Sequence, residues 1–184
     1  MNSLLVVVAY LAAMNPARTR LGVPEGEDRR ARMGMLAAGT GIGVLALAGI
    51  AALSDPLLDA LEVSPETFRI AAGFVLVIIA AWMLFVPVPA PEPVPSGTAA
   101  VFWPVAFPRV ISPETITLAL STGASDGVGL TVLGLGVAGV VLLALGPMRS
   151  AATAGRLMVA VGRILAVALV LIGIWLAIQG VREV

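Results

Sequence analysis

The chain has 184 residues, of which 59% are hydrophobic and 12% are charged, and its mean hydropathy is +1.05. Soluble domains are about 45–50% apolar and about 25% charged, so this composition excludes an ordinary water-soluble enzyme. Eleven arginines balance eleven acidic residues, and Lys, His and Cys are absent. This excludes a basic nucleic-acid surface, disulfides, thiol or imidazole catalysis and Cys or His metal ligands. We therefore expect a membrane protein that is not an enzyme and needs no cofactor.

Uncharged stretches predict an all-α fold with about six membrane-crossing segments, because a crossing helix needs about 20 mostly apolar residues. The first and fourth segments are atypical, since prolines interrupt them. The N-terminal run lacks a basic segment and a small-residue cleavage site, so we do not expect a cleaved signal peptide. The six are Met1–Ala17, Met33–Ser54, Ile70–Pro91, the pair Pro93–Pro108 with Thr115–Ser125, Gly127–Met148 and Ile164–Val181.

Arginine is unevenly distributed among the loops. Five arginines lie between the first and second predicted spans, and Arg149 and Arg156 lie between the fifth and the sixth, ahead of Arg163. The loop between the second and third is mainly acidic. Short cytoplasmic loops carry an excess of Arg and Lys. We therefore expect a multi-pass protein of the cytoplasmic (inner) membrane, with both Arg-bearing loops inside and both termini outside.

A proline-rich segment divides the chain into two halves. Residues 87–97 separate a first three-helix unit, 1–86, from a second, 98–184. The proline spacing favours an extended, polyproline-like strap. We expect a semi-rigid cytoplasmic linker; the alternative is an SH3-type ligand.

Each half begins with an interrupted hydrophobic span. Asn15-Pro16 interrupts the first, and Pro108 and Pro113 interrupt the second. Proline removes one backbone donor and frees a carbonyl, which in lipid must meet protein, a cavity or a substrate. Paired breaks in two halves are a sequence indication of a transport site.

The halves also match in spacing. Pro16 and Arg69 are 69 − 16 = 53 residues apart, and Pro108 and Arg163 are 163 − 108 = 55 residues apart. We expect both arginines to open the last long apolar helix of their half. Because each half has three spans, the halves would insert in opposite orientations. This predicts an inverted repeat with a pseudo-two-fold axis in the membrane plane and a broken first helix in each repeat.

Four stretches of the sequence carry a recognisable pattern: Asn15-Pro16, Ser64–Phe85, Trp103–Thr117 and Gly162–Val181. Together they resemble the MarC family of bacterial inner-membrane proteins. The stretch WPVAFPRVISPETIT is similar to the family's P-L-A-x-P…A-G-P-G-T-I. The resemblance implies six spans and the transport or export of small neutral amino acids. The chain departs from the family pattern where Arg18 and Arg20 follow the first break and where Ser112-Pro113-Glu114 replaces Gly-Pro-Gly.

The candidate substrate-binding residues lie at the two breaks. The Asn15 amide either binds a substrate or bridges the broken helix. Ser112-Pro113-Glu114-Thr115 predicts a helix start inside the membrane, with Ser at the N-cap and Pro at the first position. Its N–H groups either receive a substrate carboxylate or are neutralised by Glu114. The same tetrapeptide at Ser64 predicts an ordinary cap at the membrane surface. The candidates are Asn15, Pro16, Pro108, Ser112, Pro113, Glu114 and Thr115.

Three arginines are candidate structural or gating residues: Arg69, Arg109 and Arg163. Arg69 and Arg163 either extend to the membrane surface or bind carbonyls freed at a break, and Glu66 is a local partner for Arg69. Glu114 either carries a proton or forms an ion pair with Arg109 or Arg18, and we favour the ion pair.

Gly39 and Gly43 have the GxxxG spacing of close helix contacts. We expect this pair to pack within one chain; a homo-oligomer interface is the alternative.

The predicted function is secondary transport or export of a small polar solute, such as a neutral amino acid, at a site between the breaks. The sequence has no GxxxxGK[ST] phosphate loop, so a gradient would supply the energy. The alternative is a non-transporting scaffold that binds a partner protein. The expected partners are the bilayer and a small solute, with a second copy of the chain as an alternative partner, and we expect no nucleic acid.

Overall fold

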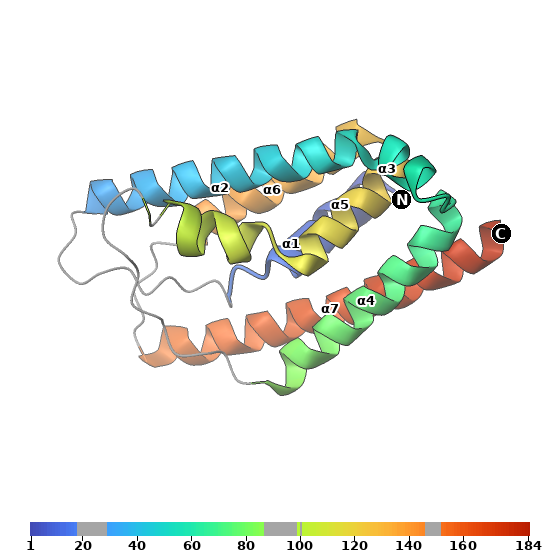
Figure 1. The fold of residues 1–184 in the computed structure, drawn as a ribbon. Helices are drawn as coiled ribbons and strands as arrows, with labels where there is room; N and C mark the ends of the chain where they lie inside the picture. Colours follow the sequence, from blue (N-terminus) through green and yellow to red (C-terminus); the bar gives the residue numbers. More distant parts are fainter. Residues whose placement is uncertain (18–28, 87–98, 100, 146–151) are drawn as a thin grey trace.

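The computed structural model describes residues 1–17, 29–86, 99, 101–145 and 152–184, and these residues form helices without strands (Figure 1). The predicted linker at 87–97 lies outside them. The elements are α1 (Ser3–Met14), α2 (Arg29–Ala52), α3 (Ser54–Ala60), α4 (Pro65–Phe85), η1 (Val101–Val110), α5 (Pro113–Asp126), α6 (Val128–Leu145) and α7 (Ala152–Glu183).

Four helices in the described ranges are long and apolar enough to cross a membrane: α2, α4, α6 and α7. α1 has 12 residues and α5 has 14. At 1.5 Å per residue they extend about 18 Å and about 21 Å, well short of a hydrocarbon core about 30 Å thick. The prediction of an all-α, multi-pass membrane protein is therefore confirmed. The first and fourth predicted spans do not form full-length helices.

The long helices surround the two short ones (Figure 1). α4 and α7 form one antiparallel pair, and α2 packs against α6 on the other side of the bundle. A Cβ atom added at Gly73 would collide with the Gly173 carbonyl, and one added at Gly173 would lie 2.8 Å from the Gly73 carbonyl. The absence of side chains at both positions lets the backbones of α4 and α7 approach closely.

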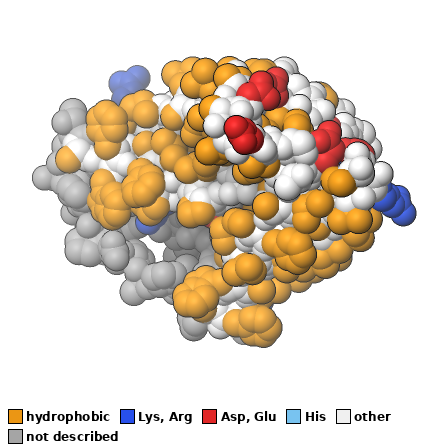
Figure 2. Space-filling model, turned by 45° about the vertical axis from the view of Figure 1, so that its right-hand side comes forward, with side chains coloured by type: hydrophobic (Ala, Val, Ile, Leu, Met, Phe, Trp, Pro, Cys, Tyr) orange, Lys and Arg blue, Asp and Glu red, His pale blue; other side chains and the backbone are white. Residues whose placement is uncertain are grey.

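Both termini and α3 lie at one end of the bundle, which we call the termini end. α2, η1 and α7 begin at the opposite end (Figure 1). The side chains of Phe74, Ile78 and Trp82 project outward from α4 and are more than 60% exposed. Hydrophobic side chains cover most of the described surface in Figure 2. Such a surface matches a lipid environment.

Two glycines of α2, Gly39 and Gly43, pack against η1. A Cβ at Gly39 would lie 2.6 Å from the Val101 carbonyl oxygen, and one at Gly43 would lie 2.6 Å from the Val110 Cβ. The expectation that the GxxxG pair packs within one chain is confirmed.

Three helix boundaries differ from the sequence predictions. The acidic segment after α2 forms α3 instead of a loop, with Asp55 and Pro56 in its first turn, where both are favourable. α2 begins at Arg29, four residues before Met33. α7 begins at Ala152, so the expectation that Arg163 opens the last helix was wrong. Arginine is a good helix former, and charge alone does not end a helix.

Candidate functional site

The first break occurs at the end of α1. Asn15 has φ 37° and ψ 71°, the left-handed conformation that Asn tolerates better than most residues, and its N–H donates to the Leu11 carbonyl at 3.1 Å. Its side-chain Nδ2 donates to the Gly162 carbonyl on α7 at 3.0 Å. Asn15 is 2% exposed. It therefore ends α1 and connects it to the second half of the chain, which is the bridging role considered above.

The second break separates η1 from α5. Phe107 and Ser112 have extended backbones, and the Phe107–Pro108 peptide bond is cis. Val110 is fully buried against Gly43 of α2. Gly43 lies 43 − 33 = 10 residues from Met33 and 52 − 43 = 9 residues from Ala52, the ends of the α2 span. The second break is therefore at the middle of a membrane-crossing helix.

The predicted helix start at Ser112 is confirmed, and its polar groups bind one another. The Ser112 N–H donates to Thr115 Oγ1 at 2.9 Å, and the Thr115 N–H donates to Ser112 Oγ at 3.4 Å. Thr115 Oγ1 in turn donates to the Val110 carbonyl at 2.7 Å. Pro113 has no N–H to offer. A substrate carboxylate at this helix end would have to displace this capping box.

The polar residues of the second break are inside the bundle, whereas its prolines are at the surface. Ser112, Glu114 and Thr115 are 5%, 8% and 0% exposed, and Pro108 and Pro113 are exposed. The prolines therefore shape the backbone and do not line the interior. Pro16, at the first break, and Arg109 are half-buried.

Each break contacts the opposite half of the chain. Asn15 binds α7 and Val110 packs on α2, while α1 and α5 contact each other. The breaks are not in equivalent positions, however. In the first half the short buried helix precedes the break, and in the second half it follows the break.

Among the described residues, the structure does not show the alternative in which Arg69 and Arg163 bind carbonyls freed at a break. Arg69 forms an ion pair with Glu183 of α7 at the termini end, instead of binding a carbonyl at a break. The carboxylate of this ion pair belongs to Glu183, and the expected local partner Glu66 also interacts electrostatically with Arg69. Arg163 is exposed, which agrees with the alternative that it extends to the membrane surface.

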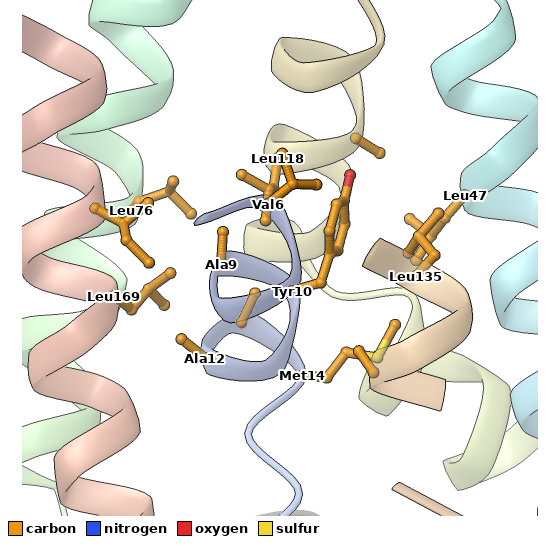
Figure 3. Packing of buried hydrophobic residues seen from close by; sticks show 14 of the residues in the cluster. Val6, Ala9, Tyr10, Ala12, Met14, Leu47, Leu76, Leu118, Leu135 and Leu169 are labelled. Carbon is orange, nitrogen blue, oxygen red and sulfur yellow. The ribbon is translucent and has the colours of Figure 1, made fainter. Parts of the chain in front are cut away.

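Three buried hydroxyls that the sequence did not bring together form a cluster, here called the hydroxyl cluster: Tyr10, Thr122 and Thr131. The Tyr10 hydroxyl lies 2.9 Å from Thr122 Oγ1, and the Thr131 hydroxyl donates to the same oxygen at 2.9 Å. All three residues are fully buried. Figure 3 shows Tyr10 projecting from α1 toward α5. The signal available in the sequence was a single tyrosine in an otherwise apolar run.

The described residues do not group into an obvious ion site. Within those ranges, no three Asp or Glu side chains come together as metal ligands. The polar interior consists instead of amide, hydroxyl and carboxyl groups at and beside the breaks. Such groups suit hydrogen bonding to a small polar molecule.

These features define an α-helical protein that crosses the membrane several times, with the end of the short helix α1 and the break between η1 and α5 in its interior. The family model described as "MarC family integral membrane protein" matches residues 26–184. The match covers 184 − 26 + 1 = 159 of 184 residues, so the chain belongs to the MarC family, as its sequence resemblance indicated. No curated protein and no solved structure matches the chain.

Proposed function

We propose that the protein is a secondary transporter or exporter of small polar solutes, such as neutral amino acids, with its site between the two helix breaks. The observation that supports this most directly is the burial of Asn15, Ser112 and Glu114 at interruptions of two helices inside a membrane bundle. Non-helical backbone at membrane depth is tolerated where it is buried in protein or lines a polar cavity. Transporters commonly use such interruptions to bind solutes.

The packing of the helices supports an inverted repeat. Each helix of the first half has a counterpart in the second: α5 for α1, α6 for α2 and α7 for α4. α1 contacts α6 and α7, and its counterpart α5 contacts α2 and α4, which are the counterparts of α6 and α7. In Figure 1 the two members of each exchanged pair run in opposite directions. A two-fold axis in the membrane plane relates helices in this way. In this proposal the halves rock about the breaks.

The direction of insertion follows from the arginines. Both termini lie at one end of the bundle, and α2 and α7 begin at the other. Arg29 and Arg30 are in the first turn of α2, and Arg156 is the fifth residue of α7. We propose that the arginine-bearing end faces the cytoplasm and the termini end faces outward, in the inner membrane. Transport would use a gradient.

The test is flux in proteoliposomes made from the purified protein. We expect labelled alanine, glycine or serine to move faster than in protein-free liposomes under a proton, sodium or substrate gradient. Asn15→Ala should lower this flux, because it removes the amide beside the first break. Asn2→Ala is the matched control, since Asn2 is exposed and only caps α1, accepting from the Leu5 N–H at 2.8 Å. If no small amino acid moves under any of these gradients, the proposal fails.

A non-transporting scaffold is the second proposal. It is supported by the closure of both breaks within the chain, through the Asn15 bond to Gly162 and the Thr115 bond to Val110. A scaffold would give no flux, would retain a stoichiometric partner on purification and would keep both breaks inaccessible to water. A transporter would give the opposite result in all three measurements.

A further inference from the structure

The hydroxyl cluster lies between the breaks and the termini end. Tyr10 is five residues before Asn15, about 7.5 Å along α1, and Thr122 is nine residues after Pro113, about 14 Å along α5. Both displacements lead toward the termini end, where α1 begins and α5 ends (Figure 1). A solute leaving the breaks toward that end would have to pass the level of the cluster.

The cluster joins the two halves of the chain through one oxygen. Thr122 Oγ1 of α5 is hydrogen-bonded to Tyr10 of α1 and accepts from Thr131 of α6, and it donates to the Leu118 carbonyl at 2.9 Å. Every hydroxyl in the cluster therefore has a partner while α1 contacts α5 and α6. Moving α1 away would leave the Tyr10 hydroxyl unpaired unless water or a solute replaced Thr122.

Gly134 of α6 lets α1 approach this closely. A Cβ at Gly134 would lie 2.6 Å from Cδ2 of the Tyr10 ring and 2.9 Å from Cγ1 of Val6. A methyl group there would push Tyr10 and α1 away from α6. Gly136, two residues later on the same helix, has no atom within 4 Å of the corresponding position.

We infer that Tyr10, Thr122 and Thr131 form a gate that is closed in this structure and separates the breaks from the termini end. The inference rests on the proposed transport function and adds the residues that control access from one side. The gate opens when α1 separates from α5 and α6, and water or the solute then binds the exposed hydroxyls. Entry from the termini end requires this separation.

A single cysteine at Ser121 reports the state of the gate. Ser121 is adjacent to Thr122 and 2% exposed, and within the described part of the chain its Oγ has no hydrogen-bond partner, so Ser121→Cys removes no such bond. The chain has no other cysteine. The measured quantity is the rate at which a membrane-impermeant maleimide labels the cysteine in sealed vesicles, applied separately from the termini side and from the opposite side.

We expect slow labelling from the termini side in the parent variant. Tyr10→Phe should raise that rate about fivefold, the shift in population that one lost hydrogen bond produces. Gly134→Ala should raise it further, because it displaces the ring sterically. Gly136→Ala should leave the rate unchanged. If Gly134→Ala does not fold, Thr131→Val replaces it, because this variant removes the second donor to Thr122. Thr40→Val is the buried control for Thr131→Val, since Thr40 Oγ1 has no described partner to lose.

Two results would overturn the gate. One is unchanged labelling in Tyr10→Phe and Thr131→Val proteins that remain monodisperse. The other is an equal increase from both sides, which indicates general loosening of the bundle. Labelling does not depend on flux, so the two proposals can fail separately. If solute moves but the variants do not label faster from the termini side, the gate is refuted. If the variants label faster but no solute moves, the transport assignment is refuted.

Discussion

The tetrapeptide Ser-Pro-Glu-Thr occurs twice in this chain, at residues 64–67 and 112–115. Both copies start a helix with Ser at the N-cap and Pro in the first turn. In the first copy, the Ser64 side chain accepts from the Thr67 N–H at 3.2 Å, and both residues are exposed. The two copies therefore share the N-cap hydrogen bond from the threonine N–H to the serine side chain.

Their surroundings differ. Apart from Pro113, the second copy is buried, and it lies at the level of Gly43, halfway along α2. Thr115 adds hydrogen bonds to the Ser112 N–H and the Val110 carbonyl. Water can replace a lost hydrogen bond at Ser64, but lipid cannot do so at Ser112. The same four residues thus form a surface cap in one place and the closure of an interior break in the other. Their depth in the membrane determines their role.

The largest difference is expected for the two glutamates. Glu114→Gln should reduce flux about tenfold or more, which corresponds to about 1.4 kcal/mol in the transport barrier, because it removes the charge beside the interior break. Glu66→Gln, in the partly exposed copy, should stay within about twofold of wild type. Initial rates in proteoliposomes test this pair of variants. Equal rates for Glu114→Gln and wild type would place the site elsewhere.

The two threonines should separate in stability. Thr115→Val leaves the Val110 carbonyl and the Ser112 N–H without the partners described here, and we expect a loss of about 2–3 kcal/mol in the free energy of unfolding. Thr67→Val at the exposed cap should cost about 0.5 kcal/mol or less, since water replaces the hydroxyl. Thermal unfolding of both variants in detergent micelles measures the difference. Equal destabilisation would contradict the assigned depths.

The smallest effect is expected beside the first copy. Arg69 pairs with Glu183, whose side chain is 45% exposed, so Arg69→Gln should change stability by about 0–1 kcal/mol. The flux should remain at the wild-type level, because the pair lies at the termini end and not at a break. The same unfolding and flux assays apply. A large loss of flux would restore the gating role considered for Arg69 in the sequence.

The features that the sequence predicted are those whose causes are local. The helix starts at Ser64 and Ser112 depend on four consecutive residues, and the interruptions depend on Asn15 and on prolines in the chain. Apolar run length was sufficient for the four full-length spans. Other helix starts were placed less well, as α3 and the start of α7 show.

The contacts that organise the interior could not be predicted from the sequence. Asn15 and Gly162 are 147 residues apart, Tyr10 and Thr122 are 112 apart, and Arg69 and Glu183 are 114 apart. A pattern of hydrophobicity or proline spacing says nothing about which of many polar residues meet over such separations. These pairs depend on how the halves pack, and only the folded structure shows it.

The most direct test of the account is whether water reaches the second break. Ser112→Cys in the cysteine-free chain should react with a small, water-soluble thiosulfonate reagent, and a transported solute should slow the reaction. Ser64→Cys, at the exposed copy, is the control and should react quickly whether or not solute is present. If Ser112→Cys stays unreactive in a folded protein while Ser64→Cys reacts, the break is dry and the proposed site between the helix breaks is wrong.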